Sequence, residues 1–144
     1  MTEYMVYAPD DGTALGVVAR DDAASIDVKA DRALQAMSRW SDLTPMKRAE
    51  ALLKIAEATR ERLPELADLL AKEQGKTRKE ALLELDRYVG PFLQYAGLAT
   101  LTGGRHQRLG GEVHGLVDRG PVGLVAAIVP WNFPASLFGS KLAP

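Results

Sequence analysis

The sequence predicts an α/β fold that is mainly helical in this portion, with a few strands toward its two ends. Apolar residues recur at three- and four-residue steps across residues 21–104, as they do on the buried faces of helices. Segments rich in turn residues, at 1–19 and 107–119, favour short strands. The run from Val122 to Val129 is apolar and partly β-branched, with no polar residue to mark an exposed face. That pattern is typical of a strand buried on both faces of a parallel sheet.

The composition limits the classes of function. The length of 144 residues fits one globular domain, and 18 Lys plus Arg nearly balance 19 Asp plus Glu. This balance argues against electrostatic capture of nucleic acid or of an anionic membrane. The chain contains no cysteine, which excludes disulfides, thiolate metal sites and a cysteine nucleophile within it. The first residues lack the basic and apolar regions of a signal peptide, so we expect a cytoplasmic protein.

The N-terminal segment is expected to form a hairpin or an extended arm. Pro9 and Asp11-Gly12 supply turn chemistry between two short apolar stretches. A helix should then run from Asp21 or Asp22 to Trp40, because its apolar residues keep helical spacing and acids crowd its first turn. We expect its apolar side to face a core.

The central helices carry their own boundary signals. Thr44-Pro45 combines a capping hydroxyl with a proline at the first helical position. Pro64 predicts two helices or a sharp kink, with the proline in the first turn of the second piece, and Gly75 should close that piece. Thr77 and Glu80 have the spacing of a capping box and should open the next helix.

The later helical region is expected to be interrupted and then to end at glycines. Gly90-Pro91 should kink or break the helix, and Gly103-Gly104 should end the helical region. The mixed charges on the helices of residues 47–87 are typical of solvated faces, so we expect no active-site carboxylate there.

Residues 105–119 form a polar, glycine-rich stretch that differs in composition from the helical region before it. Gly110-Gly111 indicates a turn, since it neither joins a strand to a helix nor carries the lysine of a phosphate-binding loop. Glu112–Arg119 alternates imperfectly and is expected to be a solvent-facing strand that leads into the buried one. His106 and His114 lie in a polar, glycine-rich stretch, without a second imidazole or carboxylate at ligand spacing on a recognisable element. We expect both to be exposed and non-catalytic.

The stretch that follows the apolar run carries the clearest candidate site. Pro130 and Pro134 bracket Trp131, Asn132 and Phe133, which makes the backbone stiff and short of donors. Ligands of open α/β sheets lie outside the carboxyl ends of the strands, and an amide placed there can donate hydrogen bonds to a developing negative charge. Alternatively, the tryptophan fills a gap and the asparagine caps the next helix. The local residues leave both readings open.

The sequence of this stretch closely resembles the strand, signature turn and following helix of the NAD(P)-dependent aldehyde dehydrogenase superfamily. The resemblance is carried by PVGLVAAIVPWNFP and by Lys141-Leu142-Ala143-Pro144 after it. Leu66–Lys76 (LADLLAKEQGK) is similar to a family segment that ends in an acid, a neighbour, Gly and Lys, and Phe92–Ala99 is similar to a family helix. The resemblance runs along essentially the whole chain. Glu73-Gln74 departs mildly from the acid and Asn that many relatives carry there.

The resemblance implies a fold and a set of site residues. The fold would be the N-terminal part of the family's Rossmann-like cofactor-binding domain. Asn132 would be the oxyanion-stabilising asparagine, whose amide holds the hemithioacetal oxyanion together with a backbone N–H of the nucleophilic cysteine. Ile128, Val129, Pro130 and Trp131 would line the cofactor cleft near the nicotinamide, and Lys141 would help to order the site. In the family a thiolate attacks the aldehyde, a hydride passes to NAD(P)+, and water activated by a glutamate hydrolyses the thioester.

The sequence departs from the family in lacking a cysteine, and it stops at Pro144, before the cofactor-ribose lysine and the catalytic domain. We therefore expect residues 1–144 to be an incomplete cofactor-binding domain that is inactive alone, with residues 107–119 contributing to oligomerisation in a complete enzyme. The partners expected for that enzyme are an aldehyde and NAD or NADP. The alternative is a non-catalytic relic, or a helical domain that binds a partner through its unsatisfied apolar strand.

Overall fold

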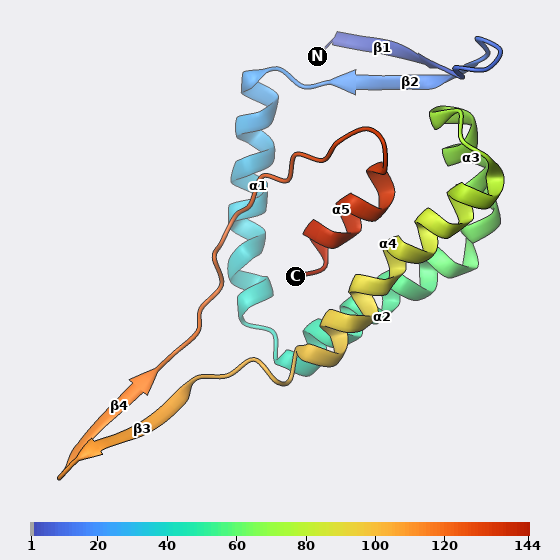
Figure 1. Cartoon of the computed structure of the whole chain (residues 1–144). Helices are drawn as coiled ribbons and strands as arrows, with labels where there is room; N and C mark the ends of the chain where they lie inside the picture. The colour runs from blue at the N-terminus through green and yellow to red at the C-terminus, as the bar shows by residue number, and fades with distance from the viewer. Residues whose placement is uncertain (1) are drawn as a thin grey trace.

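The computed structural model describes residues 2–144, and it consists of a helical body with a β-hairpin at each side (Figure 1). The elements in chain order are β1 (Thr2–Tyr7), β2 (Ala14–Arg20), α1 (Ala23–Ser41), α2 (Pro45–Glu61), α3 (Leu63–Gln74), α4 (Arg78–Leu98), β3 (Arg105–Gly110), β4 (Val113–Val117) and α5 (Pro134–Leu142). Strand β1 pairs antiparallel with β2, and β3 pairs antiparallel with β4. The β3–β4 hairpin projects away from the helices. The helices among residues 2–144 are too short or too polar to cross a bilayer.

The predicted helix boundaries are confirmed where a local signal sets them. The Thr44 hydroxyl caps α2 by accepting a hydrogen bond from the Lys47 amide at 3.3 Å. Thr77 and Glu80 form the expected capping box at the start of α4, and their hydrogen bonds lower the pKa of Glu80. Helices α2 and α3 are separate, with a proline in the first turn of α3, and the left-handed Gly75 ends α3 at φ 64°. Each signal acts within a few residues, so the sequence alone was sufficient to predict these helix boundaries.

Helix α4 forms the centre of the body and packs against α2, α3 and α5. One buried cluster joins α2, α4 and the end of α5: Ala49, Leu52, Ala56, Val89, Phe92, Ala96 and Ala143. A second cluster joins α3 to the first half of α4: Ala67, Leu70, Ala81 and Leu85. Of the two outcomes expected at Gly90-Pro91, a kink or a break, the break is absent, since α4 continues through Pro91 to Leu98. Its neighbours Val89 and Phe92 are almost fully buried, and this packing holds the helix together across the proline.

Two segments that were expected to be buried are exposed within residues 2–144. Helix α1 forms as expected, but it has no buried residue, and Ile26 and Trp40 on its apolar side are 56% and 44% exposed. The run from Val122 to Val129 has no regular secondary structure and pairs with no strand among residues 2–144. Val122 and Ile128 are each 96% exposed. A parallel strand needs neighbours for its backbone groups, and the described part of the chain supplies none.

The contact between α5 and α4 is close enough to depend on a glycine. A Cβ atom at Gly139 would lie 2.8 Å from both Cδ2 and the carbonyl oxygen of Tyr88, whose pKa is raised by burial. We expect Gly139→Ala to lower the free energy of unfolding by about 1–3 kcal/mol, because the backbone of α4 cannot move aside cheaply. Gly97→Ala is the matched control, since that helical glycine faces open space, and it should raise the free energy by about 0.5–1 kcal/mol. Urea unfolding of both variants checks the pair, and equal effects of the two substitutions would contradict the close contact.

Candidate active site

The proline-bracketed turn exposes the side chains that it carries. The backbone bends through Trp131, Asn132 and Phe133 and enters α5 at Pro134. Trp131 is 82% exposed, and the Asn132 side chain is exposed too. Within residues 2–144 the Asn132 amide group makes no hydrogen bond. It is therefore a free donor on a stiff corner of the chain.

The start of α5 is capped by a residue from another helix. Oε1 of Glu84, on α4, accepts hydrogen bonds from the backbone amides of Ala135 at 2.9 Å and Ser136 at 3.4 Å. These are the second and third residues of α5, and the first, Pro134, has no N–H to satisfy. The carboxylate also places a negative charge at the positive end of the helix dipole. Glu84 thus performs, from a distance, the role that a local capping side chain has in most helices.

Lys76 binds both the capping carboxylate and the turn. Its ammonium group forms an ion pair with Oε2 of Glu84, and it donates a hydrogen bond to the carbonyl oxygen of Asn132 at 3.2 Å. Lys76 Nζ also lies 5.0 Å from the centroid of the Phe133 ring, within range of a cation–π contact. The side chains of Glu84 and Lys76 are only 1% and 13% exposed. A buried charge is tolerated only when it is paired and hydrogen-bonded, and both conditions are met here.

This arrangement shows how the start of α5 is capped. The residue before α5 is Phe133, and no side chain of the turn caps the helix. Trp131 fills no gap, because most of its surface is exposed. Within residues 2–144, Asn132 therefore does not cap α5, because Glu84 binds the Ala135 and Ser136 amides.

The other predicted site residues are spread along the chain around the turn. Ile128 and Pro130 are exposed, and Val129 is half-buried. They precede Asn132 on the same segment. They are therefore near Asn132 in the sequence, and within residues 2–144 no fold contact draws them to it. Lys141 is exposed in the last turn of α5, at the opposite end of the helix from Asn132, and it has no ion pair or hydrogen bond within residues 2–144. Lys76, which the sequence did not single out as a site residue, is the lysine that touches the turn.

Glu84 is the functional candidate that the sequence reasoning missed. The charges of residues 47–87 were expected to form solvated faces, yet Glu84 is buried. A signal was present, because Glu84 lies between Ala81 and Tyr88 at three- and four-residue steps, on the apolar stripe of its helix. An acid on such a stripe needs a partner. Its partners could not be named from the sequence, since the α5 amides lie about fifty positions further on.

The histidines have a contact that the sequence reasoning did not foresee. The β3–β4 hairpin stacks the rings of His106 and His114 with centroids 4.9 Å apart, and Nε2 of the first lies 2.7 Å from Nδ1 of the second. Both are exposed, as expected. No third metal-ligating side chain joins them among the described residues, so the pair forms no cluster suited to a bound metal ion.

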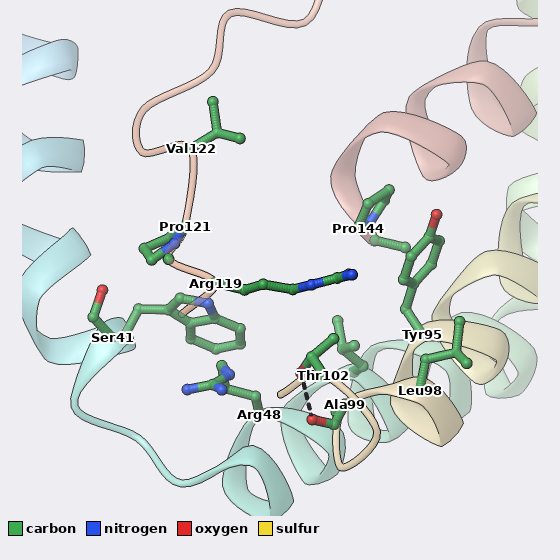
Figure 2. A pocket seen from close by; sticks show the side chains of 14 residues that line it. Ser41, Arg48, Tyr95, Leu98, Ala99, Thr102, Arg119, Pro121, Val122 and Pro144 are labelled. Carbon is green, nitrogen blue, oxygen red and sulfur yellow. Dashed lines mark hydrogen bonds between the residues drawn. The ribbon is translucent and has the colours of Figure 1, made fainter. Parts of the chain in front are cut away.

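A hollow of about 580 Å³ opens between α1, α2 and α4 and the segment after β4, away from the turn. Figure 2 shows Arg119 reaching across it toward Tyr95 and Pro144, with Arg48 below Arg119 in this view. Arg48 also donates a hydrogen bond to the Leu43 carbonyl. None of the predicted site residues lines this hollow.

Comparisons with known proteins match the chain from end to end. The family model described as "Aldehyde dehydrogenase family" matches residues 1–144. A D-glyceraldehyde dehydrogenase (NADP(+)) of Picrophilus torridus is 34% identical over 139 residues, which cover 96% of this chain and 28% of that protein. The crystal structure of PnpE in complex with nicotinamide adenine dinucleotide has a TM-score of 0.94 and 31% identity, covering 99% of this chain and 29% of that chain. The structure of an aldehyde dehydrogenase from Brucella melitensis biovar abortus 2308 has a TM-score of 0.95 at 31% identity, with 99% and 30% covered. The chain thus spans less than a third of the length of these proteins.

Proposed function

Because this chain belongs to the aldehyde dehydrogenase family, we propose that it is the N-terminal portion of an enzyme that oxidises an aldehyde to a carboxylic acid with NAD(P)+. The observation that carries the proposal is the free amide of Asn132, held on a stiff turn whose helix is capped by Glu84. An amide that the fold does not use, placed beside a helix start, is a donor available for a ligand.

The proposed role of Asn132 follows from the charge that develops in the reaction. When a cysteine thiolate adds to the aldehyde carbon, the carbonyl π bond breaks and its electron pair moves to the oxygen. The Asn132 amide would donate a hydrogen bond to that oxygen. A preorganised donor of this kind is worth about 3 kcal/mol in the transition state when water is excluded. The chain has no cysteine, so the nucleophile must come from polypeptide outside these 144 residues.

The residues next to the turn fit one wall of a cofactor site. Ile128 and Trp131, which precede Asn132 in the sequence, expose large apolar side chains, at 96% and 82%. Such surfaces suit the flat ring of a nicotinamide, and NAD(P)+, when bound, would accept the hydride. Val129 and Pro130 would complete this wall. We also propose that Lys141 supports the site, in the complete enzyme, through contacts that lie outside the present chain.

The exposed apolar segments support the view that further polypeptide covers this portion. Val122 to Val129 offers an unpaired backbone, to which neighbouring strands of a parallel sheet would bond. The projecting β3–β4 hairpin exposes Leu109, Leu116 and Val117, which suits contacts between subunits. We propose a cytoplasmic homo-oligomer in which residues 107–119 contribute to assembly.

The same exposed segment also favours the alternative of a non-catalytic domain that binds a partner. The nucleotide sequence after the Pro144 codon separates the two functions. A continuing frame that encodes a lysine-bearing strand and a glycine-flanked cysteine supports the enzyme. A stop codon together with a stably expressed 144-residue product supports the partner-binding domain and contradicts the enzyme.

The isolated 144-residue chain is expected to show no NAD(P)-dependent oxidation of any aldehyde. The physical reason is that it contains no cysteine to form the hemithioacetal. The measurement is NAD(P)H absorbance with a panel of aliphatic and aromatic aldehydes, with the complete polypeptide that contains this segment as the positive control. Turnover by the purified short chain would contradict the proposal that the nucleophile lies outside these 144 residues.

A further inference from the structure

We propose that Lys76 and Glu84 are positioning residues for the reaction, and that they act by fixing the direction in which Asn132 presents its amide. The inference rests on the proposed function of Asn132 and deepens it. Neither residue would touch substrate or cofactor. The name Lys76–Glu84 pair is used below for these two side chains.

The pair contacts the turn at the Asn132 carbonyl and at the residues that follow it. Lys76 donates to the carbonyl oxygen of Asn132 itself, at 3.2 Å, and its ammonium group lies 5.0 Å from the ring centroid of Phe133. Glu84 binds the amides of Ala135 and Ser136 just after the turn. Contacts at residues 132, 133, 135 and 136 restrain the peptide group that follows Asn132, which is one of the two that orient its Cα–Cβ bond.

Burial makes this attachment rigid. Glu84 is 1% exposed, so water does not compete for its oxygens, and its two oxygens serve the helix and the lysine separately. The exposed pairs Lys47–Glu50 and Arg62–Glu65 join residues only three positions apart, and exposed pairs of this kind contribute little. The Lys76–Glu84 pair instead connects the start of α4 to the turn more than fifty residues later.

The arrangement also gives the buried charge pair a physical role. A local cap on α5 would need a side chain from the turn, and Asn132 is the nearest residue of a capping type. Because Glu84 performs the capping and Lys76 neutralises it, the asparagine remains available. Removal of the lysine would leave the carboxylate unpaired and the Asn132 carbonyl free to turn.

A double-mutant cycle on the complete enzyme tests the inference, with Lys76→Met, Asn132→Ala and the two combined. Lys76→Met should lower kcat by about tenfold or more with little change in KM, because a displaced donor loses transition-state stabilisation. In the Asn132→Ala background the same substitution should change kcat less than threefold. Lys76→Arg, which keeps a charged donor, should recover part of the lost rate. Lys47→Met is the matched control and should leave kcat unchanged. Circular dichroism establishes that each variant is folded.

The outcomes separate the inference from the function on which it rests. If Asn132→Ala leaves kcat unchanged, the proposed function fails and the inference falls with it. If Asn132→Ala slows the enzyme but Lys76→Met has the same effect in both backgrounds, or none, the function stands and the positioning role is overturned. Should Lys76→Met fail to fold, the cycle is run with Glu84→Gln, which keeps the shape and one acceptor oxygen. A loss of kcat that disappears with Asn132→Ala is again the expected result, and an additive loss overturns the inference.

Discussion

Asn132→Ala is expected to lower kcat of the complete enzyme by about 10²–10³-fold, while substrate binding changes much less. The loss corresponds to one missing donor to the developing oxyanion. The expectation depends on the amide being unused in the ground state, and the structure meets this condition because Glu84, not Asn132, satisfies the start of α5. Removal of the amide should therefore leave the fold intact.

Steady-state kinetics of the variant, with the free energy of unfolding measured alongside, checks this prediction. Gln94→Ala is a suitable control, because it removes an exposed amide from α4, away from the turn. It should leave kcat and stability unchanged. A variant at position 132 that loses stability as much as activity would show that the amide serves the fold instead.

Phe92→Ala should lower the free energy of unfolding of the chain by about 3–5 kcal/mol. Phe92 is fully buried at the centre of α4, and its ring packs against Tyr88 with centroids 5.0 Å apart. Its removal leaves a cavity in the cluster that joins α2, α4 and α5, so the support of the turn is weakened as well. Domains are stable by only about 5–15 kcal/mol, so this one substitution removes a large share.

The measurement is urea unfolding, followed by circular dichroism, with the midpoint and slope determined for each variant. Leu83→Ala provides the comparison, since Leu83 lies on the same helix and is 52% exposed. It should change stability by about 0.5 kcal/mol or less. Similar losses for both substitutions would mean that α4 has no distinct buried side.

The sequence predicted the helices well where their ends are set locally. Thr44, Gly75 and Thr77 act on backbone groups within one turn, and the structure contains each of their caps. At Gly90-Pro91 the sequence left a kink and a break open, and only the break is excluded, since α4 continues through Pro91.

The predictions of burial failed for a different reason. An apolar stripe or run indicates which side chains a segment could bury. It does not indicate whether another segment is present to cover them. Helix α1 and the Val122–Val129 segment both have apolar patterns, and both remain exposed within the described chain. The comparisons agree with this reading, because the matched proteins are more than three times as long as the region that they share with it.

Part of the candidate site could be predicted from the sequence, and part could not. The bracketing prolines and Asn132 stand out in the sequence, and they indicate a rigid corner. The Lys76–Glu84 pair does not, since its contacts to the turn connect residues more than fifty positions apart. Only the folded chain shows that the capping requirement of α5 is met from α4, and this contact is what leaves the asparagine available.

A crystal structure of the complete enzyme with an aldehyde trapped on its cysteine tests the central claim most directly. The Asn132 amide nitrogen is predicted to lie about 2.7–3.1 Å from the oxygen of the trapped adduct. An amide turned away from that oxygen and hydrogen-bonded to the start of α5 would contradict the account.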